Sequence, residues 1–281
     1  MTNPQIPGLL LSGGLGFLMG LTDDAYNTKP LLKLSIQILC GIILVLTGTS
    51  ISAFESDWLN IGLSILWTVG IMNSINMLDN MDGIAASVST FILTTPLIFM
   101  IATSTHTSVD FMLILGVLAS LVGFLYYNWN PSLMFMGDTG SQFLGVILAY
   151  VGIHYCWNVG IEVSTARGWY SLAALLVVFI LPISDTLTVT INRLRRKQSP
   201  FVGGKDHTTH HLCYRGFSDV QVAKIFVLLS AISTFLYTTY ILYIAPSEYF
   251  LVGVYIAYFL IVFLILYSLT VINRKKGIVD H

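Results

Sequence analysis

Charged residues are scarce in this chain: Asp, Glu, Lys and Arg make up 10% of its 281 residues. A typical soluble domain has about 25%. Hydrophobic residues account for 55%, and the mean hydropathy is +0.80. A soluble core of this size could not bury so much apolar surface. The composition therefore excludes an ordinary water-soluble domain and predicts that lipid surrounds much of the chain.

Two further shortages narrow the function. The formal net charge is −1, and the lack of a basic excess argues against nucleic acid as a partner. The only three cysteines are Cys40, Cys156 and Cys213. They stand in or beside apolar stretches at no metal-ligand spacing, so we interpret them as buried thiols.

Long apolar runs alternate with short polar breaks along the whole chain. Most runs have the roughly 20 residues that a spanning helix needs, and backbone groups in lipid must be paired within their own helix. We therefore predict an all-α fold, a polytopic membrane helix bundle forming one integral membrane domain over residues 1–281. About nine transmembrane helices are expected, at residues 8–21, 33–54, 58–77, 84–104, 110–127, 139–157, 170–192, 220–244 and 249–272.

The basic residues predict the orientation. If the C-terminal cluster Arg274, Lys275 and Lys276 is cytoplasmic, alternation makes residues 22–32, 78–83, 128–138 and 193–219 cytoplasmic too. All but one of the 13 Lys and Arg residues then lie at that side or at the helix ends beside it, and Arg167 is the exception. The positive-inside rule favours this arrangement. It also gathers four polar clusters on one face.

The first cluster is Asp23-Asp24, at the end of the first apolar run. Adjacent carboxylates at a membrane boundary repel each other and lose hydration, which favours a divalent cation or a shared proton. An exposed acidic turn explains the pair equally well when the pair is taken alone.

The second cluster is Asn73, Asn76, Asp79 and Asp82. A step of three residues turns a helix by about 300°, so neighbours in this series lie on adjoining parts of one face. Asn76 and Asp79 offer oxygen ligands suited to Mg²⁺. Polar residues reaching out from a helix end are the alternative, but two carboxylates and two amides in series favour a functional site.

The third cluster is Gly137-Asp138-Thr139-Gly140-Ser141, ahead of a long apolar run. The glycines would let backbone N–H groups turn towards an anion at a helix N-terminus, which is a natural phosphate site. Asp138 would then hold a metal that bridges phosphate oxygens. An ordinary helix cap and turn is the alternative interpretation.

The fourth cluster is the longest polar stretch, residues 193–219. His207, His210 and His211 could suggest zinc, but no Cys or Glu completes a zinc protease pattern. Together with Arg193 and its basic neighbours, the histidines suit a bound polyanion. A topology signal that contacts anionic lipid headgroups explains the RLRRK run, but not the glycines and histidines.

Taken together, four stretches resemble the polytopic polyprenyl-phosphate N-acetylhexosamine-1-phosphate transferases of glycosyltransferase family 4. They are GLTDDAYNTKPLLKLSIQ, NSINMLDNMDGIAASVS, NWNPSLMFMGDTGSQFLG and LPISDTLTVTINRLRRKQSPFVGGKDHTTHHL, in the order of the family. The resemblance covers roughly residues 16–230. It implies transfer of a sugar phosphate from a UDP-N-acetylhexosamine to polyprenyl phosphate, such as undecaprenyl phosphate, with release of UMP and with Mg²⁺ or Mn²⁺ as cofactor.

The resemblance also implies roles for single residues. Asp138 and Asn76 match the metal-binding positions, and Lys33 matches a basic residue near the lipid phosphate. The remaining matches are the pair Asp23 and Asp24 at the lipid phosphate, Asp79, Asp82 and Asn128 near the nucleotide-sugar, and His207, His210 and His211 in a loop that contacts the donor. Because the nucleophile is already an anion, we favour electrostatic positioning over general-base catalysis for Asp23.

Two departures from the family pattern matter. The aspartate pair follows the first apolar run here and the third in the family, so we expect about two family helices, with a cytoplasmic loop, to be missing from residues 1–281. An impaired fragment of such an enzyme is therefore an alternative. The loop reads KDHTTHHL and lacks three adjacent histidines, which favours UDP-N-acetylglucosamine or UDP-N-acetylgalactosamine as donor.

Rival classes explain the sequence less well. A CDP-alcohol phosphotransferase would need an Arg after Asp82-Gly83 and further carboxylates, which are absent. An ion-coupled transporter would place its carboxylates near the membrane midplane, whereas these lie at span ends. The expected location is the bacterial inner membrane, with the site and the C-terminus cytoplasmic, and a homodimer is expected.

Overall fold

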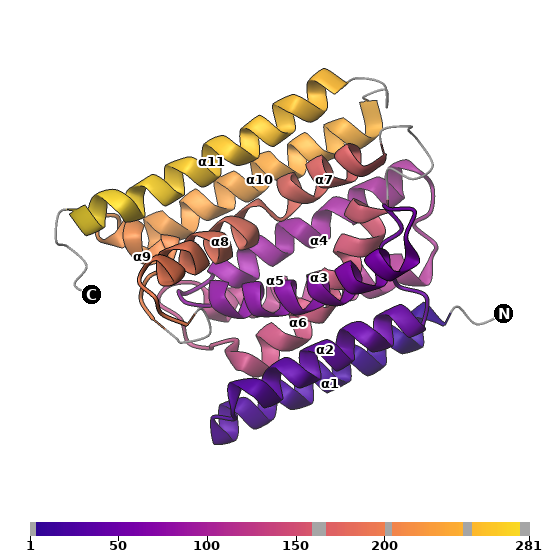
Figure 1. Ribbon diagram of the computed structural model, residues 1–281, viewed down its shortest axis with the longest axis horizontal. Helices are drawn as coiled ribbons and strands as arrows, with labels where there is room; N and C mark the ends of the chain where they lie inside the picture. Colours follow the sequence, from indigo (N-terminus) through magenta and orange to yellow (C-terminus); the bar gives the residue numbers. More distant parts are fainter. Residues whose placement is uncertain (1–3, 159–166, 200–203, 244–248, 276–281) are drawn as a thin grey trace.

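The computed structural model describes residues 4–158, 167–199, 204–243 and 249–275, and within these ranges no residue is in a strand. The chain folds into helices throughout (Figure 1). The α-helices are α1 (Gln5–Tyr26), α2 (Pro30–Leu46), α3 (Asp57–Leu78), α4 (Ile84–Ala102), α5 (Val109–Asn128), α6 (Gly137–Gly152), α7 (Arg167–Val178), α8 (Ile180–Arg195), α9 (Thr208–Cys213), α10 (Asp219–Tyr243) and α11 (Tyr249–Lys275). A π-helical turn, η1 (Ile153–Trp157), continues α6.

The all-α membrane bundle predicted from the apolar runs is confirmed. Six described helices are long and apolar enough to cross a membrane, or seven if α7 and α8, bent by 86° at their junction, form one broken span. The expected count was about nine. Two of the nine expected spans are not in the structural count, because their helices, α2 with 17 residues and α6 with 16, are too short to be counted as spanning helices. The apolar run 33–54 outlasts its helix because Gly48, with a positive φ of 90°, follows the end of α2.

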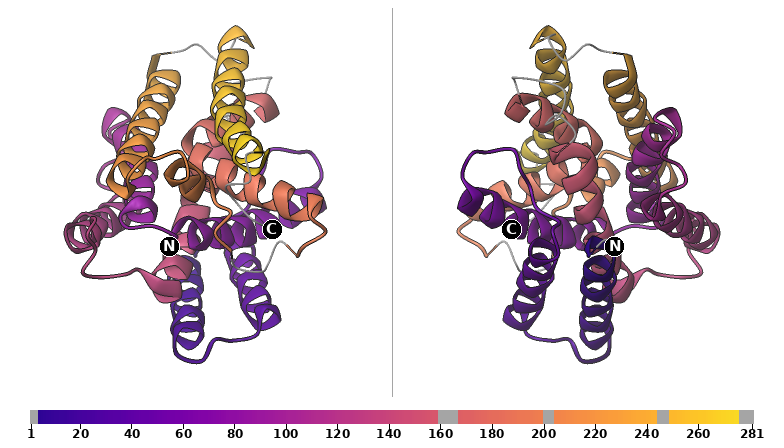
Figure 2. Two further views of the ribbon diagram at one scale, coloured as in Figure 1. Left: turned by 90° about the vertical axis from the view of Figure 1, so that its left-hand side faces the viewer. Right: turned by 90° about the vertical axis from the view of Figure 1, so that its right-hand side faces the viewer.

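The helices pack in two groups. Helix α6 packs against α1 and α3, and α2 packs against the same two helices. Helix α4 packs against α5 and α10, while α11 covers α7, α8 and α9. Figure 2 shows the turn between α1 and α2 at the lower edge of the bundle. The first group of four helices supplies most of the residues discussed below.

Large apolar side chains face outward where lipid is expected. Helix α5 is the clearest case, because only 11% of its most apolar window is buried inside the protein. Met112 and Val122, for example, are 66% and 56% exposed. Such a surface would aggregate in water, and it suits hydrocarbon.

Candidate active site

Polar residues from several helices meet at one end of the bundle, the left-hand end in Figure 1. The end of α1, the start of α2, the end of α3, the start of α6 and the short α9 all lie there. The sequence placed its four polar clusters on one face. The structure joins Asp24 and Asn76 directly to the start of α6, and it joins Thr209 of the fourth cluster to Asn80 just beyond α3.

Lys33 at the start of α2 is the centre of the site. Its Nζ lies 3.3 Å from Asp23 Oδ2 and 3.3 Å from Asn76 Oδ1, and it forms an ion pair with Asp138 Oδ2. The Asn76 amide donates to Asp138 Oδ1 at 2.7 Å and to Ser141 Oγ at 3.0 Å. Four helices, α1, α2, α3 and α6, therefore contribute side chains to a single cluster.

These oxygens suit a divalent cation. Asp23, Asn76 and Asp138 turn three oxygens from three helices towards one positive atom, the Lys33 ammonium nitrogen. Mg²⁺ is typically held by one or two carboxylates together with substrate phosphates. No group of three or more His, Cys, Asp or Glu in the described residues could hold a metal by itself. The donor set here differs because it contains an amide, and it fits a Mg²⁺ that takes its other ligands from the substrate.

Asp24 binds the N-terminus of α6. Its carboxylate accepts from the backbone N–H of Asp138 and of Thr139, each at 2.9 Å, and from Thr139 Oγ1 at 2.6 Å. The sequence predicted an anion at this helix end. In this structure the acceptor is a carboxylate of the protein itself, and the phosphate expected there stays a prediction.

The first turn of α6 begins earlier than the apolar pattern indicated. We expected a glycine turn ahead of a helix over residues 139–157, whereas Gly137 is already the first helical residue. Gly137 has a φ of +63°, and a Cβ there would lie 2.9 Å from Asp24 Oδ2. A Cβ at Gly20 would lie 2.2 Å from the Asp138 carbonyl oxygen. These two glycines let α1 and α6 approach closely enough for Asp24 to reach its donors.

Asp23 is held by its own loop. Thr28 donates to Asp23 Oδ1 from its backbone N–H at 2.8 Å and from its hydroxyl. Oδ2 faces Lys33. Both oxygens are therefore fixed by donors, which is the arrangement expected of a carboxylate that positions charge.

A layer of amides lies one helical turn deeper. Gln37 and Gln142 follow Lys33 and Asp138 by four residues on α2 and α6, whereas Asn73 precedes Asn76 by three residues on α3. Gln37 Nε2 donates to Gln142 Oε1 at 3.0 Å and to Asn73 Oδ1 at 3.2 Å, and Asn73 Nδ2 donates to Gln37 Oε1 at 2.7 Å. Gln37 and Gln142 are almost fully buried. This neutral layer ties together the helices that carry the charged cluster.

Asp79 and Asp82 lie just beyond the end of α3. Burial raises the pKa of the Asp79 carboxyl to about 7, and the charges of Asp138, Asp24 and Asp82 add to this rise. Asp82 Oδ2 accepts from Asn130 Nδ2 at 3.0 Å and from Ser132 N at 3.1 Å. A group that titrates near pH 7 at the edge of an acidic cluster is typical of a functional site.

The Asn128 side chain forms hydrogen bonds within the protein. Its side chain accepts from Gly83 N at 3.0 Å and donates to the Met134 carbonyl at 2.8 Å, and it is 3% exposed. It therefore shapes the loop that carries Asp82. The substrate contact expected of Asn128 stays a prediction.

The histidine loop is anchored to α8 and to α3. His207 Nδ1 lies 2.8 Å from Asp185 Oδ2. Thr209 Oγ1 donates to Asn80 Oδ1 at 2.6 Å, which places the start of α9 beside Asp79. His211 is enclosed, because Asn273 on α11 donates to its carbonyl at 2.8 Å. Burial lowers the pKa of His211 to about 4 and also lowers that of the partly buried His210.

Arg193, in the last turn of α8, binds the segment that leads into α9. Its guanidinium donates to both oxygens of Asp206, at 3.0 and 2.7 Å, and Arg196 binds the same carboxylate. Burial works against the charge of Asp206, but the two guanidinium groups hold its pKa below the usual range. Arg193 is only 5% exposed. In this structure it organises the loop, and its predicted contact with substrate stays untested.

Sequence reasoning assigned no role to several side chains that hold the site together. Asp185, Thr28 and Thr139 fix His207, Asp23 and Asp24 respectively. A signal for Asp185 was available, since a carboxylate within an apolar run is costly unless it has a partner. Thr139 stood within the third predicted cluster, whereas nothing in the spacing of Thr28 marks it, because its partner is set by backbone geometry.

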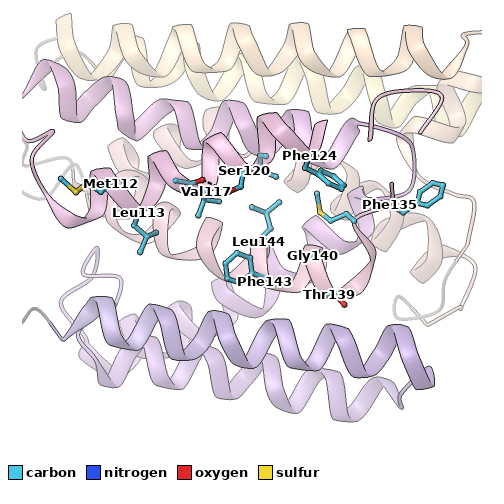
Figure 3. Close-up of a pocket in the computed structure, with 13 residues that line it drawn as sticks. Met112, Leu113, Val117, Ser120, Phe124, Phe135, Thr139, Gly140, Phe143 and Leu144 are labelled. Atoms are coloured by element: carbon cyan, nitrogen blue, oxygen red, sulfur yellow. Dashed lines mark hydrogen bonds between the residues drawn. The ribbon is translucent and has the colours of Figure 1, made fainter. Parts of the chain in front are cut away.

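An apolar cavity of about 530 Å³ lies between α5 and α6, next to this site. Figure 3 shows its lining, which includes Leu113, Val117, Phe124 and Phe143. At one end it reaches Thr139, the residue that binds Asp24. Apolar surface that suits hydrocarbon therefore adjoins the charged cluster.

Comparison with known proteins identifies relatives of this chain. The chain is 31% identical over 240 residues to a probable undecaprenyl-phosphate N-acetylglucosaminyl 1-phosphate transferase of Bacillus subtilis, covering 82% of this chain and 64% of that protein. It is 26% identical to a decaprenyl-phosphate N-acetylglucosaminephosphotransferase of Mycolicibacterium smegmatis, covering 82% and 62%. A phospho-N-acetylmuramoyl-pentapeptide-transferase of Lacticaseibacillus paracasei is 28% identical, covering 83% and 73%.

The alignments leave part of the relatives unmatched. The chain spans somewhat less than two thirds of the length of the Bacillus and Mycolicibacterium proteins. The family profile of glycosyl transferase family 4 matches residues 6–155, which include Asp23, Lys33, Asn76 and Asp138. The match covers more than half of the chain and contains the four side chains that meet at the Lys33 centre, so this chain belongs to glycosyl transferase family 4.

Proposed function

We propose that this protein transfers a sugar 1-phosphate from a UDP-N-acetylhexosamine to a polyprenyl phosphate at the membrane. The products are a polyprenyl-diphosphate sugar and UMP. The observation that carries the proposal is the cluster in which Lys33 meets Asp23, Asn76 and Asp138 from four helices at one end of a membrane bundle. The names of the relatives in Bacillus and Mycolicibacterium support the same reaction class.

The reaction joins two anions, so its main obstacle is electrostatic. A phosphate oxygen of the lipid attacks the β-phosphorus of the nucleotide sugar. The bond from that phosphorus to the bridging oxygen breaks, and UMP leaves with the electron pair. Lys33 is the ammonium nearest to three of the site oxygens, and it would hold the lipid phosphate and offset its charge.

The lipid phosphate needs little help in losing a proton. It is already an anion at neutral pH, so Asp23 has little work to do as a base. Its two oxygens, bound by Thr28 and Lys33, instead fix the position of the ammonium group. Asp24 similarly fixes the first turn of α6 and with it the backbone of Asp138.

The oxygen donors of the cluster would hold Mg²⁺. Asp138 and Asn76 are its ligands in this proposal, and the ion would offset negative charge on the diphosphate of the donor. Asp79 and Asp82 flank Asn80, and Asn80 accepts a hydrogen bond from Thr209 at the start of α9. Asp79, Asp82 and the histidine loop would receive the nucleotide sugar, with UDP-N-acetylglucosamine as the expected donor.

The orientation is part of the proposal. The site would face the cytoplasm of a bacterial cell, at the inner membrane, because the basic residues gather on the same side as the charged cluster. Lys276, one member of the C-terminal basic group, lies outside the described residues. The expected homodimer stays a prediction, for which light scattering of the purified protein is the test.

Release of UMP tests the function directly. Purified protein in lipid nanodiscs, given undecaprenyl phosphate, radiolabelled UDP-N-acetylglucosamine and MgCl₂, is expected to form a labelled lipid and an equal amount of UMP. EDTA should stop both. Asp138→Asn should lower turnover by at least about a hundredfold, the order of magnitude lost when one electrostatic group is removed from a preorganised site.

A matched control uses a carboxylate that is remote from the site. Glu55 is exposed in the segment between α2 and α3, at the other end of the bundle. Glu55→Gln should leave turnover unchanged. Absence of UMP release from folded protein with every UDP-N-acetylhexosamine in a donor panel would refute the proposed function.

A further inference from the structure

The carboxylate of Asp185 lies on α8 and is only 1% exposed. Three donors surround it. His207 Nδ1 lies 2.8 Å from Oδ2, while Oδ1 accepts from the backbone N–H of Thr208 at 2.8 Å and from Thr208 Oγ1 at 2.7 Å. A buried carboxylate needs such partners. All three come from the first residues of the histidine loop.

This contact decides which nitrogen of His207 carries a proton. An ionised carboxylate is only an acceptor, so Nδ1 must donate to Asp185. Nε2 is then left to act on other groups. A second partner that orients one ring nitrogen is the usual way in which proteins fix the tautomer of a working histidine.

The start of α9, directly after His207, is tied to the segment that follows α3. The neighbouring Thr209 is bonded to Asn80, the residue after Asp79. The His207 ring is 5.8 Å from the ring of His210, and the side chain is 8% exposed. The described groups that act on His210 include His207, Asp185 from α8, and Lys205 and Asp206 from the preceding segment, while Arg196 acts on His211 of α9.

We propose that Asp185 is a positioning residue for the donor substrate: it accepts the Nδ1 hydrogen bond of His207 and so turns Nε2 of that imidazole towards the diphosphate of the nucleotide sugar. This inference rests on the proposed function for the identity of the donor. It adds a residue that acts through His207 and needs no contact of its own with substrate.

The competing explanation is that Asp185 serves only as a tie between α8 and the start of α9. Thr208 separates the two explanations, because its hydroxyl bonds to the same carboxylate without contacting the imidazole. Thr208→Val removes the hydroxyl hydrogen bond to Asp185 and replaces the side chain by one of nearly the same shape. Asp185→Asn keeps an oxygen that can accept from Thr208 but offers an N–H₂ group, which cannot accept from Nδ1, on the other side.

The first measurement needs no turnover. Protein labelled with ¹⁵N-histidine is examined by NMR, and the ring signals of His207 are assigned with His207→Gln. We expect a protonated Nδ1 in the unmodified protein and in Thr208→Val, and an unprotonated Nδ1 in Asp185→Asn. UDP-N-acetylglucosamine, added as the probe, should shift the Nε2 signal of the unmodified protein.

The second measurement is the kinetic split. Asp185→Asn should raise KM for UDP-N-acetylglucosamine about tenfold or more, the loss expected for one hydrogen bond to a charged group. KM for undecaprenyl phosphate should stay unchanged, and Thr208→Val should change neither constant by more than about twofold.

Specific results would overturn the inference. A His207 that carries its only proton on Nε2 in the unmodified protein contradicts it, even if Asp185→Asn fails to fold. Equal effects of Asp185→Asn and Thr208→Val on donor KM would show that the carboxylate is only a tie. Failure of the proposed function would appear differently, as absent transfer despite the expected Nδ1 signal.

Discussion

At the residue scale, the site depends on one cation placed among oxygens. The Lys33 side chain is mostly buried, at 16% exposed, so water screens its charge only in part. It keeps the carboxylates of Asp23 and Asp138 on either side of one ammonium group. The loss of this single charge should therefore affect both carboxylates at once.

Lys33→Met tests this dependence. We expect turnover to fall by about a hundredfold or more, since a preorganised charge at a phosphoryl-transfer site contributes on that scale. We also expect KM for the lipid phosphate to rise more than KM for the nucleotide sugar. Lys29→Met, four residues earlier on the exposed turn, is the matched control and should behave as the unmodified protein does. Similar losses for the two variants would contradict the assignment.

The burial of His211 gives a pH dependence of stability. Its folded pKa of about 4 lies below the ordinary value of 6.5, so between these values the unfolded chain binds the proton more readily. The stabilising contribution is complete above pH 6.5 and is lost as the pH falls from 6.5 towards 4. The midpoint of thermal unfolding should drop over this range, and less so in His211→Gln. If the unfolding midpoint of His211→Gln falls with pH as steeply as that of the unmodified protein, another group is responsible.

At the scale of elements, two contacts hold the four helices of the site in register. One is the close approach of α1 to α6 at Gly20, and the other is the amide layer of Gln37, Asn73 and Gln142. Both lie beneath or beside the charged cluster. They determine whether side chains on α1, α2, α3 and α6 can meet.

Gly20→Ala should separate α1 from α6. The added Cβ would lie 2.2 Å from a backbone oxygen of Asp138, which cannot move away as a flexible side chain would. We expect a loss of about 1–3 kcal/mol in the free energy of unfolding, measured by denaturant titration, with a loss of activity. Gly14→Ala on the same helix has open space around its Cβ and serves as the control. Equal stability of the two variants would argue against close packing at Gly20.

Gln142→Leu should weaken the amide layer. Gln37 would lose its 3.0 Å partner while remaining buried, which costs about 1–3 kcal/mol. We expect a lower unfolding temperature and a reduced turnover, because Lys33 stands one turn from Gln37 on α2. Ser35→Ala, the control, removes an exposed hydroxyl from α2 and should change neither the unfolding temperature nor the turnover. If Gln142→Leu is less stable but fully active, the amide layer supports the fold only and does not position Lys33.

At the scale of the whole molecule, the proposal requires that the two ends of the bundle face different compartments. Lys29 lies in the turn between α1 and α2 near the site, and Thr107 lies in the exposed segment between α4 and α5. Both positions are exposed, so a cysteine at either should react with a maleimide that reaches it.

Labelling of intact cells tests the orientation. With a membrane-impermeant maleimide, Thr107→Cys should be labelled in spheroplasts, whereas Lys29→Cys should be labelled only after the membrane is opened. The unmodified protein, with its own three cysteines, sets the background. The reverse pattern would place the charged cluster on the outer face and remove its access to a cytoplasmic nucleotide sugar.

The sequence by itself determined that lipid surrounds much of the protein, which segments are helical, and at which end of the bundle the polar site residues lie. Hydropathy and the scarcity of charge carry that information locally, because each span must satisfy its own backbone in lipid. The motifs around Asp23, Asn76, Asp138 and His207 likewise identified the family. The number of full-length helices did not follow from the apolar runs, since an apolar run can outlast its helix, as the run 33–54 does.

Only the tertiary structure decided which of these side chains meet. Asp24 binds the start of α6, Lys33 stands between two carboxylates, and Asp185 holds His207, and each contact joins residues at least ten positions apart in sequence. Such pairings depend on how closely helices approach and how they rotate about their axes. Those quantities are set by packing, above all at Gly20 and in the amide layer, and no local pattern in the sequence records them.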